Sequence, residues 1–424
     1  MRPFPLTPEI HFLSKLALDK HPSKIVLFIM DGVGDLPDFN TGKTPLESAR
    51  TPTMDKLAKE GALGLLDPIS TGITPGSGPA HLSLFGYDPV FYEVGRGVLS
   101  VFGVRYLDKT PMSAGQLGAR INFATVKRQG KDLSIADRRA GRIQDAPAKE
   151  IVAELQRAYA KSPAPGVKVE IFHEKEHRCA MLLSGKGLAP GVCDTDPQVT
   201  GKPPIKPQPE PEAANKTGAA RTAKALAAII DKTAKVLIDQ PSANYILVRG
   251  VDAYRPLPQL PEFTKMRCLG VASYPMYRGV ARLAGMHVPD SGDTLETQLD
   301  TLKKHWNDFD YFFFHVKKTD SAGEDGNLQK KIEVIEKADE IVAGIMELGP
   351  DVLAVTADHS TPVLMKAHSF HPVPLLLWGK LIRRDAAASF GETACASGGL
   401  GRMPSKQLLP LLMANAGKLA KYGA

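Results

Sequence analysis

The sequence predicts an α/β fold in which a doubly wound, mostly parallel sheet carries an inserted α+β domain. Two observations predict this fold class. Several short apolar runs are continuous rather than alternating, which is typical of strands buried on both faces. Between these runs lie segments with the apolar spacing of helices, and such alternation of strands and helices is typical of sheets covered by helices.

The elements of the sheet follow from these patterns. The runs KIVLFIM, YFFFHV, VLAVT and VPLLLW predict buried parallel strands at residues 24–30, 311–316, 352–356 and 373–378. Residues 328–348 predict a helix, because Ile332, Ile335 and Ala338 fall on one face.

Three of the strands end in acidic or histidine-containing loops, at residues 31–32, 317–325 and 358–359. Ligands of open α/β sheets bind outside the carboxyl ends of the strands. We therefore expect these loops to form one shared site.

The middle of the chain predicts an inserted domain over about residues 113–262. It holds apolar segments that begin with GQLGARINFATV, and it continues with strands at residues 167–172, 179–183 and 245–248 and a helix at residues 222–239. The proline-rich stretch GKPPIKPQPEP, residues 201–211, predicts an irregular loop. Residues 1–112 and 263–424 would then form the other domain.

Composition indicates an ordinary globular protein of two or three domains, with 424 residues, 43% hydrophobic and 23% charged. No apolar run approaches the roughly 20 residues of a membrane span. Proline and charge interrupt the N-terminal segment, so it does not resemble a signal peptide. The four cysteines lie far apart without a CxxC pair. We expect a cytoplasmic protein with no membrane partner, no disulfide framework and no structural zinc.

The net charge of +7 comes from dispersed Lys and Arg residues, with no long basic block. General solubility and attraction of a small anionic substrate explain this charge better than nucleic-acid binding, for which the chain has no recognisable module. We therefore expect no nucleic-acid partner. The sequence leaves the oligomeric state open, and a homo-oligomer is compatible with it.

Polar residues at the strand ends offer a hydroxyl and six metal ligands. Asp31 ends an apolar strand just before a glycine, where a carboxylate can bind a hard cation. Ser77 precedes a helix predicted at residues 80–85, and a helix N-terminus favours phosphate. Each residue alone is better explained as a turn, capping or surface residue. Together, seven residues make a metal site the better explanation: Asp31, Ser77, Asp320, Glu324, Asp358, His359 and His368, with His371 as a rival for His368.

Such a set could hold two metal ions close together. One would lower the pKa of the serine, and the other would polarise the phosphoryl oxygens. Phosphoryl transfer needs mainly positioning and charge neutralisation, which this cluster supplies.

The motifs, taken in order, resemble those of archaeal-type 2,3-bisphosphoglycerate-independent phosphoglycerate mutases, in the alkaline phosphatase superfamily. The chain contains DGVGD, GSGPAHL with GYDP, TDSAG and TADHSTP, and the segments TPTMDKLA, GRGVLS, ADRRAGRI and EHRCAMLL are also similar. The resemblance implies an alkaline-phosphatase-like metal-binding domain and an inserted substrate-binding domain. It also implies two divalent metal ions, with Mn²⁺ ahead of Mg²⁺ or Zn²⁺, and no 2,3-bisphosphoglycerate.

By the same resemblance, one metal would be held by Asp31, Ser77, Asp358 and His359, and the other by Asp320, Glu324 and His368. Ser77 would take the phosphoryl group from 3-phosphoglycerate, and the glycerate would reorient before the group returns to its other hydroxyl. Side chains that grip the phosphate and the carboxylate are expected in the inserted domain, with surface salt bridges as the alternative: Arg138, Arg142, His177, Arg178 and Arg249.

Three residues depart from the family pattern. Glu324 stands where a metal-binding His is usual, which favours harder metals over zinc. Gly78 stands where Asp is usual, and Ser100 where Glu is usual. These departures keep open a phosphomonoesterase or a small-molecule kinase, such as a homoserine kinase, built on the same core. A binding protein that senses phosphoglycerate without turnover is a third reading, and the retained Ser77 argues against it.

Overall fold

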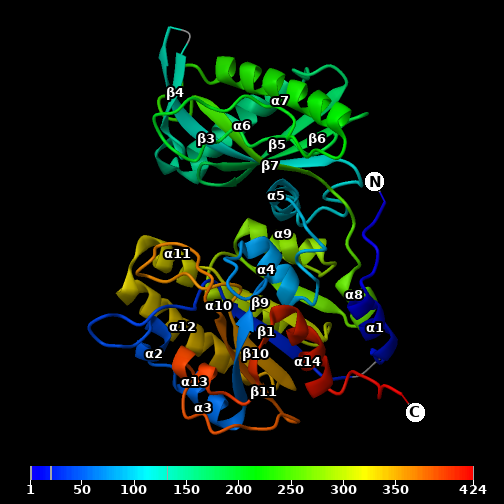
Figure 1. The fold of residues 1–424 in the computed structure, drawn as a ribbon, viewed down its shortest axis with the longest axis vertical. Coiled ribbons are helices and arrows are strands. Elements are labelled where there is room, and N and C mark those ends of the chain that lie inside the picture. Colours follow the sequence, from blue (N-terminus) through cyan, green and yellow to red (C-terminus); the bar gives the residue numbers. More distant parts are fainter. Residues whose placement is uncertain (1, 20–21, 131, 424) are drawn as a thin grey trace. The chain divides into compact units, whose positions relative to one another are not determined.

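The computed structural model describes residues 2–19, 22–130 and 132–423 (Figure 1). The chain forms two compact units. Unit 1 comprises Met1–Pro3 and Val94–Pro256, and unit 2 comprises Phe4–Glu93 and Leu257–Ala424. In the described part of the chain, no helix is both long enough and apolar enough to cross a membrane.

Unit 2 is built on a seven-stranded sheet with the strand order β12-β2-β11-β10-β1-β9-β8. Strand β1 pairs in parallel with both β9 and β10, and β8 pairs in parallel with β9. The predicted mostly parallel sheet is confirmed. Its strands are β1 (Ile25–Met30), β2 (Ala62–Asp67), β8 (Cys268–Val271), β9 (Tyr311–Val316), β10 (Val352–Thr356), β11 (Val373–Gly379) and β12 (Gly401–Pro404).

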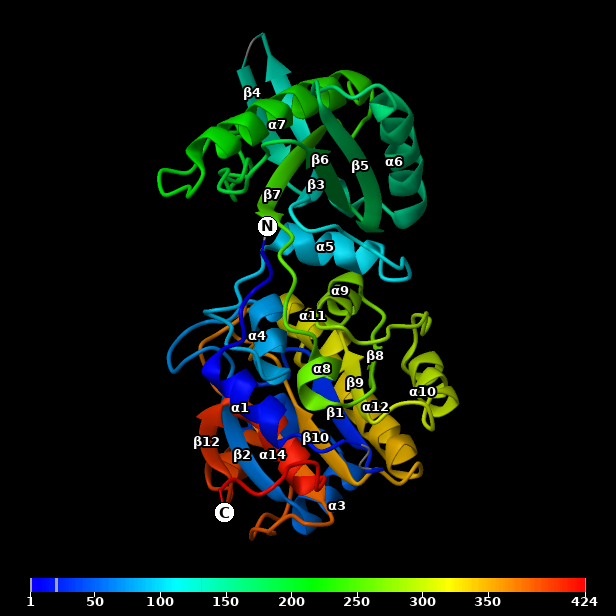
Figure 2. The same cartoon turned by 90° about the vertical axis from the view of Figure 1, so that its right-hand side faces the viewer.

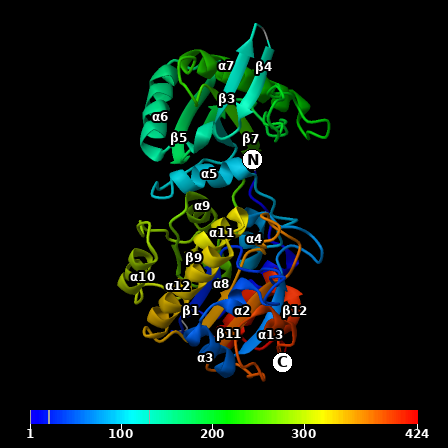
Figure 3. The ribbon, with the colours of Figure 1, turned by 90° about the vertical axis from the view of Figure 1, so that its left-hand side faces the viewer.

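Helices cover both faces of this sheet, which explains why β1, β9 and β10 are buried along their whole length. Figure 3 shows α2 (Pro45–Ser48), α3 (Pro52–Glu60) and α12 (Leu328–Met346) in front of the sheet. The view from the other side, in Figure 2, shows α1 (Pro8–Leu16), α8 (Leu260–Thr264) and α14 (Leu408–Asn415) in front of it. The remaining helices of unit 2 are α4 (Ser77–Leu84), α9 (Pro275–Leu283), α10 (Leu295–Lys304), α11 (Lys318–Asp325) and α13 (Glu392–Ala396).

Strand β11 corrects one part of the prediction. It occupies the predicted residues but runs antiparallel to both of its neighbours, β10 and β2. Its apolar run is continuous because helices bury both faces of the sheet, and burial of this kind does not depend on strand direction. The apolar pattern therefore locates the strand and cannot give its direction.

Unit 1 is an antiparallel sheet covered by helices. The strands are β3 (Leu117–Gln129), β4 (Asp132–Asp137), β5 (Val167–Lys175), β6 (Arg178–Gly185) and β7 (Tyr245–Ala253), in the order β4-β3-β6-β5 with β7 on the other edge of β3. Helices α6 (Asp145–Tyr159) and α7 (Lys216–Val236) pack on one face, and α5 (Arg96–Val104) lies against the other (Figures 2 and 3). Helix α7 begins six residues before the predicted helix at residues 222–239, since Asn215 caps it and Ala219 already packs in the core.

Candidate active site

Four chain segments of unit 2 meet at one edge of the seven-stranded sheet. Asp31 opens the segment after β1, here called the β1 loop (residues 31–36), and Asp358 lies in the segment after β10, the β10 loop (residues 357–363). Asp320 follows β9 within α11. Because β11 is antiparallel to β10, its first residues lie at the same edge, and His368 precedes them.

Asp31, Asp358 and His359 form one group of converging donor atoms, and all three side chains are fully buried. The Nε2 atom of His359 lies 3.2 Å from Asp31 Oδ1 and 3.2 Å from Asp358 Oδ2. The same Nε2 atom lies 3.2 Å from the Oγ atom of Ser77. Two carboxylates and an imidazole are ligands that divalent first-row metals accept, and the hydroxyl of a serine stands beside them.

Asp320, His359 and His368 form a second group. His368 Nε2 lies 3.7 Å from Asp320 Oδ1, and the two histidine rings stack with their centroids 3.6 Å apart. The Thr361 hydroxyl donates to Asp320 Oδ1 at 2.7 Å and lies 2.9 Å from His359 Nδ1. The carbonyl oxygen of Pro75 lies 3.0 Å from His368 Nδ1.

These contacts determine the tautomers of both histidines. The Pro75 carbonyl can only accept, so Nδ1 of His368 carries the proton. The Thr361 hydroxyl donates to Asp320, so it accepts from Nδ1 of His359. Nε2 of each ring then keeps a lone pair on the side of the carboxylates, and neutral imidazole of this kind is the form that binds metals.

Burial and charge act against each other on Asp31 and act together on Asp358. Burial by itself raises the pKa of Asp31, but the positive charge of Lys317 holds that pKa well below its usual range. Burial and the negative charge of Asp31 raise the pKa of Asp358 well above its usual value. Lys317 Nζ lies 3.0 Å from Asp31 Oδ2 and also contacts Asp320. A bound cation would stabilise such closely spaced buried carboxylates.

Two buried carboxylate oxygens of the first group have no hydrogen-bond partner among the described residues: Asp31 Oδ1 and Asp358 Oδ2. Buried polar atoms are nearly always paired, so these two need an explanation. Both lie beside the lone pair of His359, and Tyr277 donates to the other oxygen of Asp31, which fixes that carboxylate. The residues therefore fit a divalent cation.

Ser77 is the first residue of α4 and is half-buried. Its hydroxyl therefore stands next to the unpaired backbone N–H groups of a helical first turn, which attract phosphate. One turn later, His81 Nδ1 donates to the Ser77 carbonyl at 2.8 Å and lies 3.4 Å from Asp358 Oδ2. The His81 ring therefore fixes the carbonyl of Ser77 from within the same helix.

Glu324 lies apart from both groups. Residues 318–325 form helix α11 instead of the expected loop, and the helix ends at Gly326, whose φ of 70° suits a left-handed cap. Asp320 is buried on this helix, whereas Glu324 in its last turn is exposed. The rival His371 pairs with the Ser369 hydroxyl at 2.9 Å and joins neither group within the described chain.

A second cluster, here called the arginine pocket, lies in unit 1 and has a volume of about 120 Å³. Four of the five predicted cations line it, and the exposed Arg142 does not. The lining side chains are Arg96, Arg120, Asn122, Arg138, Arg139, His177, Arg178 and Arg249. They come from α5, β3, β6, β7, the segment after β4 and, for His177, the turn between β5 and β6.

The arginine pocket is rich in positive charge, since six arginines line it. Arg138 pairs with Asp196 at 2.8 Å, Arg249 contacts Asp194 and Asp196, and Arg120 pairs with Glu174 at 3.3 Å. Burial, followed by the charges of neighbouring arginines, lowers the pKa of His177 to about 3. His177 is therefore neutral at pH 7, and the pocket is suited to bind an anion.

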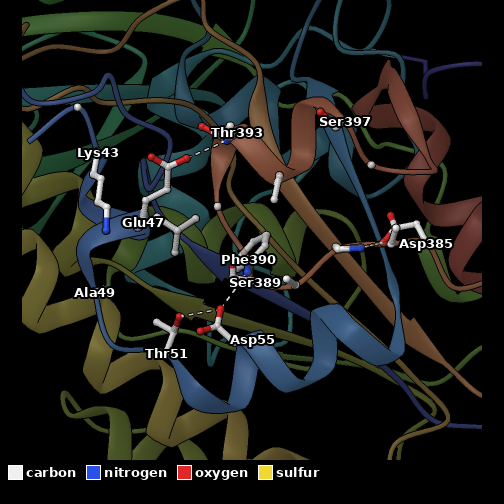
Figure 4. A pocket seen from close by; sticks show the side chains of 18 residues that line it. Lys43, Glu47, Ala49, Thr51, Asp55, Asp385, Ser389, Phe390, Thr393 and Ser397 are labelled. Atoms are coloured by element: carbon white, nitrogen blue, oxygen red, sulfur yellow. Dashed lines mark hydrogen bonds between the residues drawn. The ribbon is translucent and has the colours of Figure 1, made fainter.

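Another cavity of unit 2, about 690 Å³, lies beside α2 and α13 (Figure 4). Its carboxylates already have protein partners. Glu47 accepts from the Thr393 amide at 2.9 Å, and Asp55 accepts from the Phe390 amide at 2.9 Å. These side chains hold the cavity wall together.

The chain matches the model of the Metalloenzyme superfamily over residues 23–415. A Thermus thermophilus protein named "Probable 2,3-bisphosphoglycerate-independent phosphoglycerate mutase" is 47% identical over 415 residues, 97% of this chain and 98% of that protein. A Thermotoga maritima protein of the same name is 45% identical over 413 residues, again 97% and 98% of the two chains. The chain belongs to this phosphoglycerate mutase family.

Solved structures agree with this family membership. The PH0037 protein of Pyrococcus horikoshii has a TM-score of 0.79 and 30% identity, with 96% of this chain and 100% of that chain covered. The cofactor-independent phosphoglycerate mutase from Thermoplasma acidophilum has a TM-score of 0.63 and 28% identity, with 93% and 100% covered. The resemblance read from the sequence motifs is confirmed.

Several residues of the candidate metal site and of the arginine pocket were not predicted from the sequence. Lys317, Thr361 and Tyr277 contact the predicted metal ligands, and Arg96 and Arg120 line the arginine pocket. Lys317 directly follows an apolar strand, in HVKKTD, and this position at a strand end could have indicated that it belongs to the site. Tyr277 gives no comparable signal, because it reaches Asp31 from a helix 246 residues away in sequence.

Proposed function

We propose that this chain interconverts 3-phosphoglycerate and 2-phosphoglycerate without 2,3-bisphosphoglycerate, with Ser77 as the nucleophile of a two-metal site. One observation carries the proposal. The Ser77 hydroxyl lies 3.2 Å from His359 Nε2, beside a buried set of metal-type donors in which two carboxylate oxygens have no hydrogen-bond partner among the described residues. Membership of the phosphoglycerate mutase family supports the choice of substrate.

Asp31, Ser77, Asp358 and His359 would hold one metal, and Asp320 and His368 the other. Bound divalent metals would lower the pKa of the serine hydroxyl and neutralise charge on the phosphoryl group. The oxygen and nitrogen donors favour Mn²⁺ or Mg²⁺. Since Glu324 is exposed on α11, we propose that it does not complete the second set in this conformation.

The proposed reaction is two transfers at Ser77. Its Oγ forms a bond to phosphorus as the bond from phosphorus to the glycerate 3-oxygen breaks, and the serine proton ends on that oxygen. The 2-oxygen of the glycerate then attacks the phosphoserine, and its proton returns to Ser77. The Lys317 ammonium, beside Asp31, and the first turn of α4 would offset the phosphoryl charge.

We propose that the arginine pocket of unit 1, and hence the inserted domain predicted over residues 113–262, binds the carboxylate and phosphate of the substrate. Arginines can grip either group with two hydrogen bonds, and six of them line the pocket. A small phosphorylated substrate also agrees with the expected cytoplasmic location. We expect neither a nucleic-acid partner nor a membrane partner.

The test is ³¹P NMR of the protein with Mn²⁺ and 3-phosphoglycerate, and without 2,3-bisphosphoglycerate. We expect 2-phosphoglycerate to appear, and chelation of the metal to stop its formation. Ser77→Ala should be silent, whereas Ser83→Ala, a buried serine on the same helix, should retain turnover. Release of inorganic phosphate instead would identify a phosphomonoesterase. No reaction despite bound metal would contradict the proposed mutase.

A further inference from the structure

Lys331 is a fully buried lysine outside the proposed metal ligands. It lies in the first turn of α12, shortly after the N-cap residue Asn327. The helix dipole disfavours a cation there, and burial lowers the pKa of the Lys331 ammonium. A buried charge in such a place needs specific partners.

Those partners come from both loops that carry the first group of donors. Lys331 Nζ donates to Asp35 Oδ2 at 2.7 Å and to the Gly32 carbonyl at 2.9 Å, both in the β1 loop. It also donates to the Thr361 carbonyl at 2.9 Å, in the β10 loop. An ammonium has three donors, so all of them are used to join the β1 loop to the β10 loop.

The carboxylate of Asp35 extends this connection. It accepts from the Val363 amide at 3.1 Å, in the β10 loop, and from the Leu36 amide at 2.8 Å, in its own loop. The Thr361 amide in turn donates to the carbonyls of Gly32 and Gly34, at 3.2 and 3.0 Å. The two loops are therefore joined by a closed network in which Lys331 and Asp35 are the charged members.

We propose that Lys331 is a positioning residue of the metal centre. Through Asp35, Gly32 and Thr361 it holds the β1 loop and the β10 loop at the separation in which their carboxylates and His359 converge. It acts through these groups and contacts no proposed metal ligand by its side chain. The inference rests on the proposed metal site, and it assigns a function to a residue of helix α12 that the mechanism above does not use.

Positioning and simple electrostatics predict opposite effects on metal binding. Removing a nearby positive charge should by itself strengthen the binding of Mn²⁺. Loss of the positioning contacts should weaken it, and loss of such outer contacts typically reduces metal affinity about 10-fold to 100-fold. The direction of the change in Kd therefore separates the two effects.

The experiment is a Mn²⁺ titration of the full chain, followed by the EPR signal of the free ion, with Tm measured for each variant. We expect Lys331→Met to raise the Kd for Mn²⁺ about 10-fold or more. The double variant Lys331→Met with Asp35→Asn leaves no unpaired charge, so it should recover much of the lost Tm while the Kd stays raised.

Asp339→Asn is the matched control. Asp339 is also buried on α12, but it accepts from the amides of Thr53 and Met54 at the start of α3, away from both loops. This variant should lower Tm and leave the Kd for Mn²⁺ unchanged within about twofold. A larger rise than that in Asp339→Asn would show that general destabilisation weakens the metal site, and would contradict a specific role for Lys331.

Two further outcomes are distinct. If the wild type binds Mn²⁺ but a folded Lys331→Met variant, single or double, binds it equally well or more tightly, the positioning role is wrong and the metal site stands. If the wild type shows no saturable Mn²⁺ binding, the proposed metal site is wrong, and this inference is overturned with it.

Discussion

Four of the proposed metal-ligand side chains are each held by a second group. Tyr277 holds Asp31, the Thr361 hydroxyl orients both Asp320 and His359, and the Pro75 carbonyl orients His368. Such contacts fix tautomers and carboxylate orientations before any metal binds. The sequence allowed the donors to be predicted because they lie in motifs at strand ends. The groups that hold them are scattered along the chain, and only the fold brings them there.

At the same scale, Arg96→Ala tests the arginine pocket. Arg96 is exposed and has no ion pair among the described residues, so its removal should change stability little. We expect KM for 3-phosphoglycerate to rise about 10-fold or more, because a hydrogen bond between charged groups contributes roughly 1.5–3 kcal/mol. Arg157→Ala, an exposed arginine of unit 1 on α6, is the control and should leave KM unchanged. Equal KM values for both variants would argue against substrate binding by the arginine pocket.

At the scale of elements, sequence periodicity located the buried strands of unit 2 within one residue at most ends, since helices cover both faces and keep the runs apolar. It could not give the direction of β11, which depends on the connection to its neighbours. It also missed helix α11, because KTDSAGED is short and polar, and its packing onto α12 rather than its composition stabilises it.

Substitution of Gly32, in the β1 loop, should strongly reduce stability. A Cβ atom there would lie 2.5 Å from Thr361 Oγ1, and the residue has a φ of 61°. Gly42 has a similar φ of 66° with nothing within 4 Å, so it is a matched control for backbone strain alone. We expect Gly42→Ala to cost about 1 kcal/mol of unfolding free energy. Gly32→Ala should cost about 1–3 kcal/mol more and weaken Mn²⁺ binding. Equal losses of unfolding free energy for the two variants in denaturant titrations would contradict the close packing of Gly32 against Thr361.

Helix α13 predicts a dependence of stability on pH. Burial raises the pKa of Glu392 to about 7, even though its carboxylate accepts from the Thr44 hydroxyl and the Asp35 amide. A raised pKa in the folded state stabilises the protein at low pH, and this contribution is lost as pH rises from about 4.5 to 7. The loss is at most about 3 kcal/mol.

The measurement compares unfolding free energies of the wild type and Glu392→Gln between pH 5 and 7.5. Residue 392 of the variant cannot ionise. The unfolding free energy of the wild type should therefore fall relative to that of the variant as pH rises. A difference that stays constant across this range would show that Glu392 keeps an ordinary pKa.

At the scale of the whole molecule, the proposed metal centre depends on two distant parts of the chain. Asp31 and Asp358 come from the two segments of unit 2 that flank unit 1, so the site exists only when both segments have folded together. The fold class and the family could be predicted from the sequence, because motifs and apolar runs extend over most of the chain. The predicted boundaries near residues 113 and 262 remain a prediction.

Removal of the metal should therefore lower the stability of unit 2 and leave that of unit 1 nearly unchanged. Mn²⁺ at about 100 times its Kd should stabilise unit 2 by about 2.7 kcal/mol, because only the folded unit brings the donors together. Calorimetry with Mn²⁺ and with a chelator should show a shift in the transition of unit 2 and little change in that of unit 1. Shifts of equal size in both transitions, or none, would contradict a metal centre confined to unit 2.

The central claim is that Ser77 carries the phosphoryl group during turnover, and one measurement tests it most directly. Protein mixed with Mn²⁺ and 3-phosphoglycerate is quenched in acid, digested and analysed by mass spectrometry. The account predicts one phosphoryl group on the peptide that contains Ser77, and none when the metal is chelated. A peptide that stays unmodified while 2-phosphoglycerate accumulates, or a phosphoryl group on another residue, would contradict it.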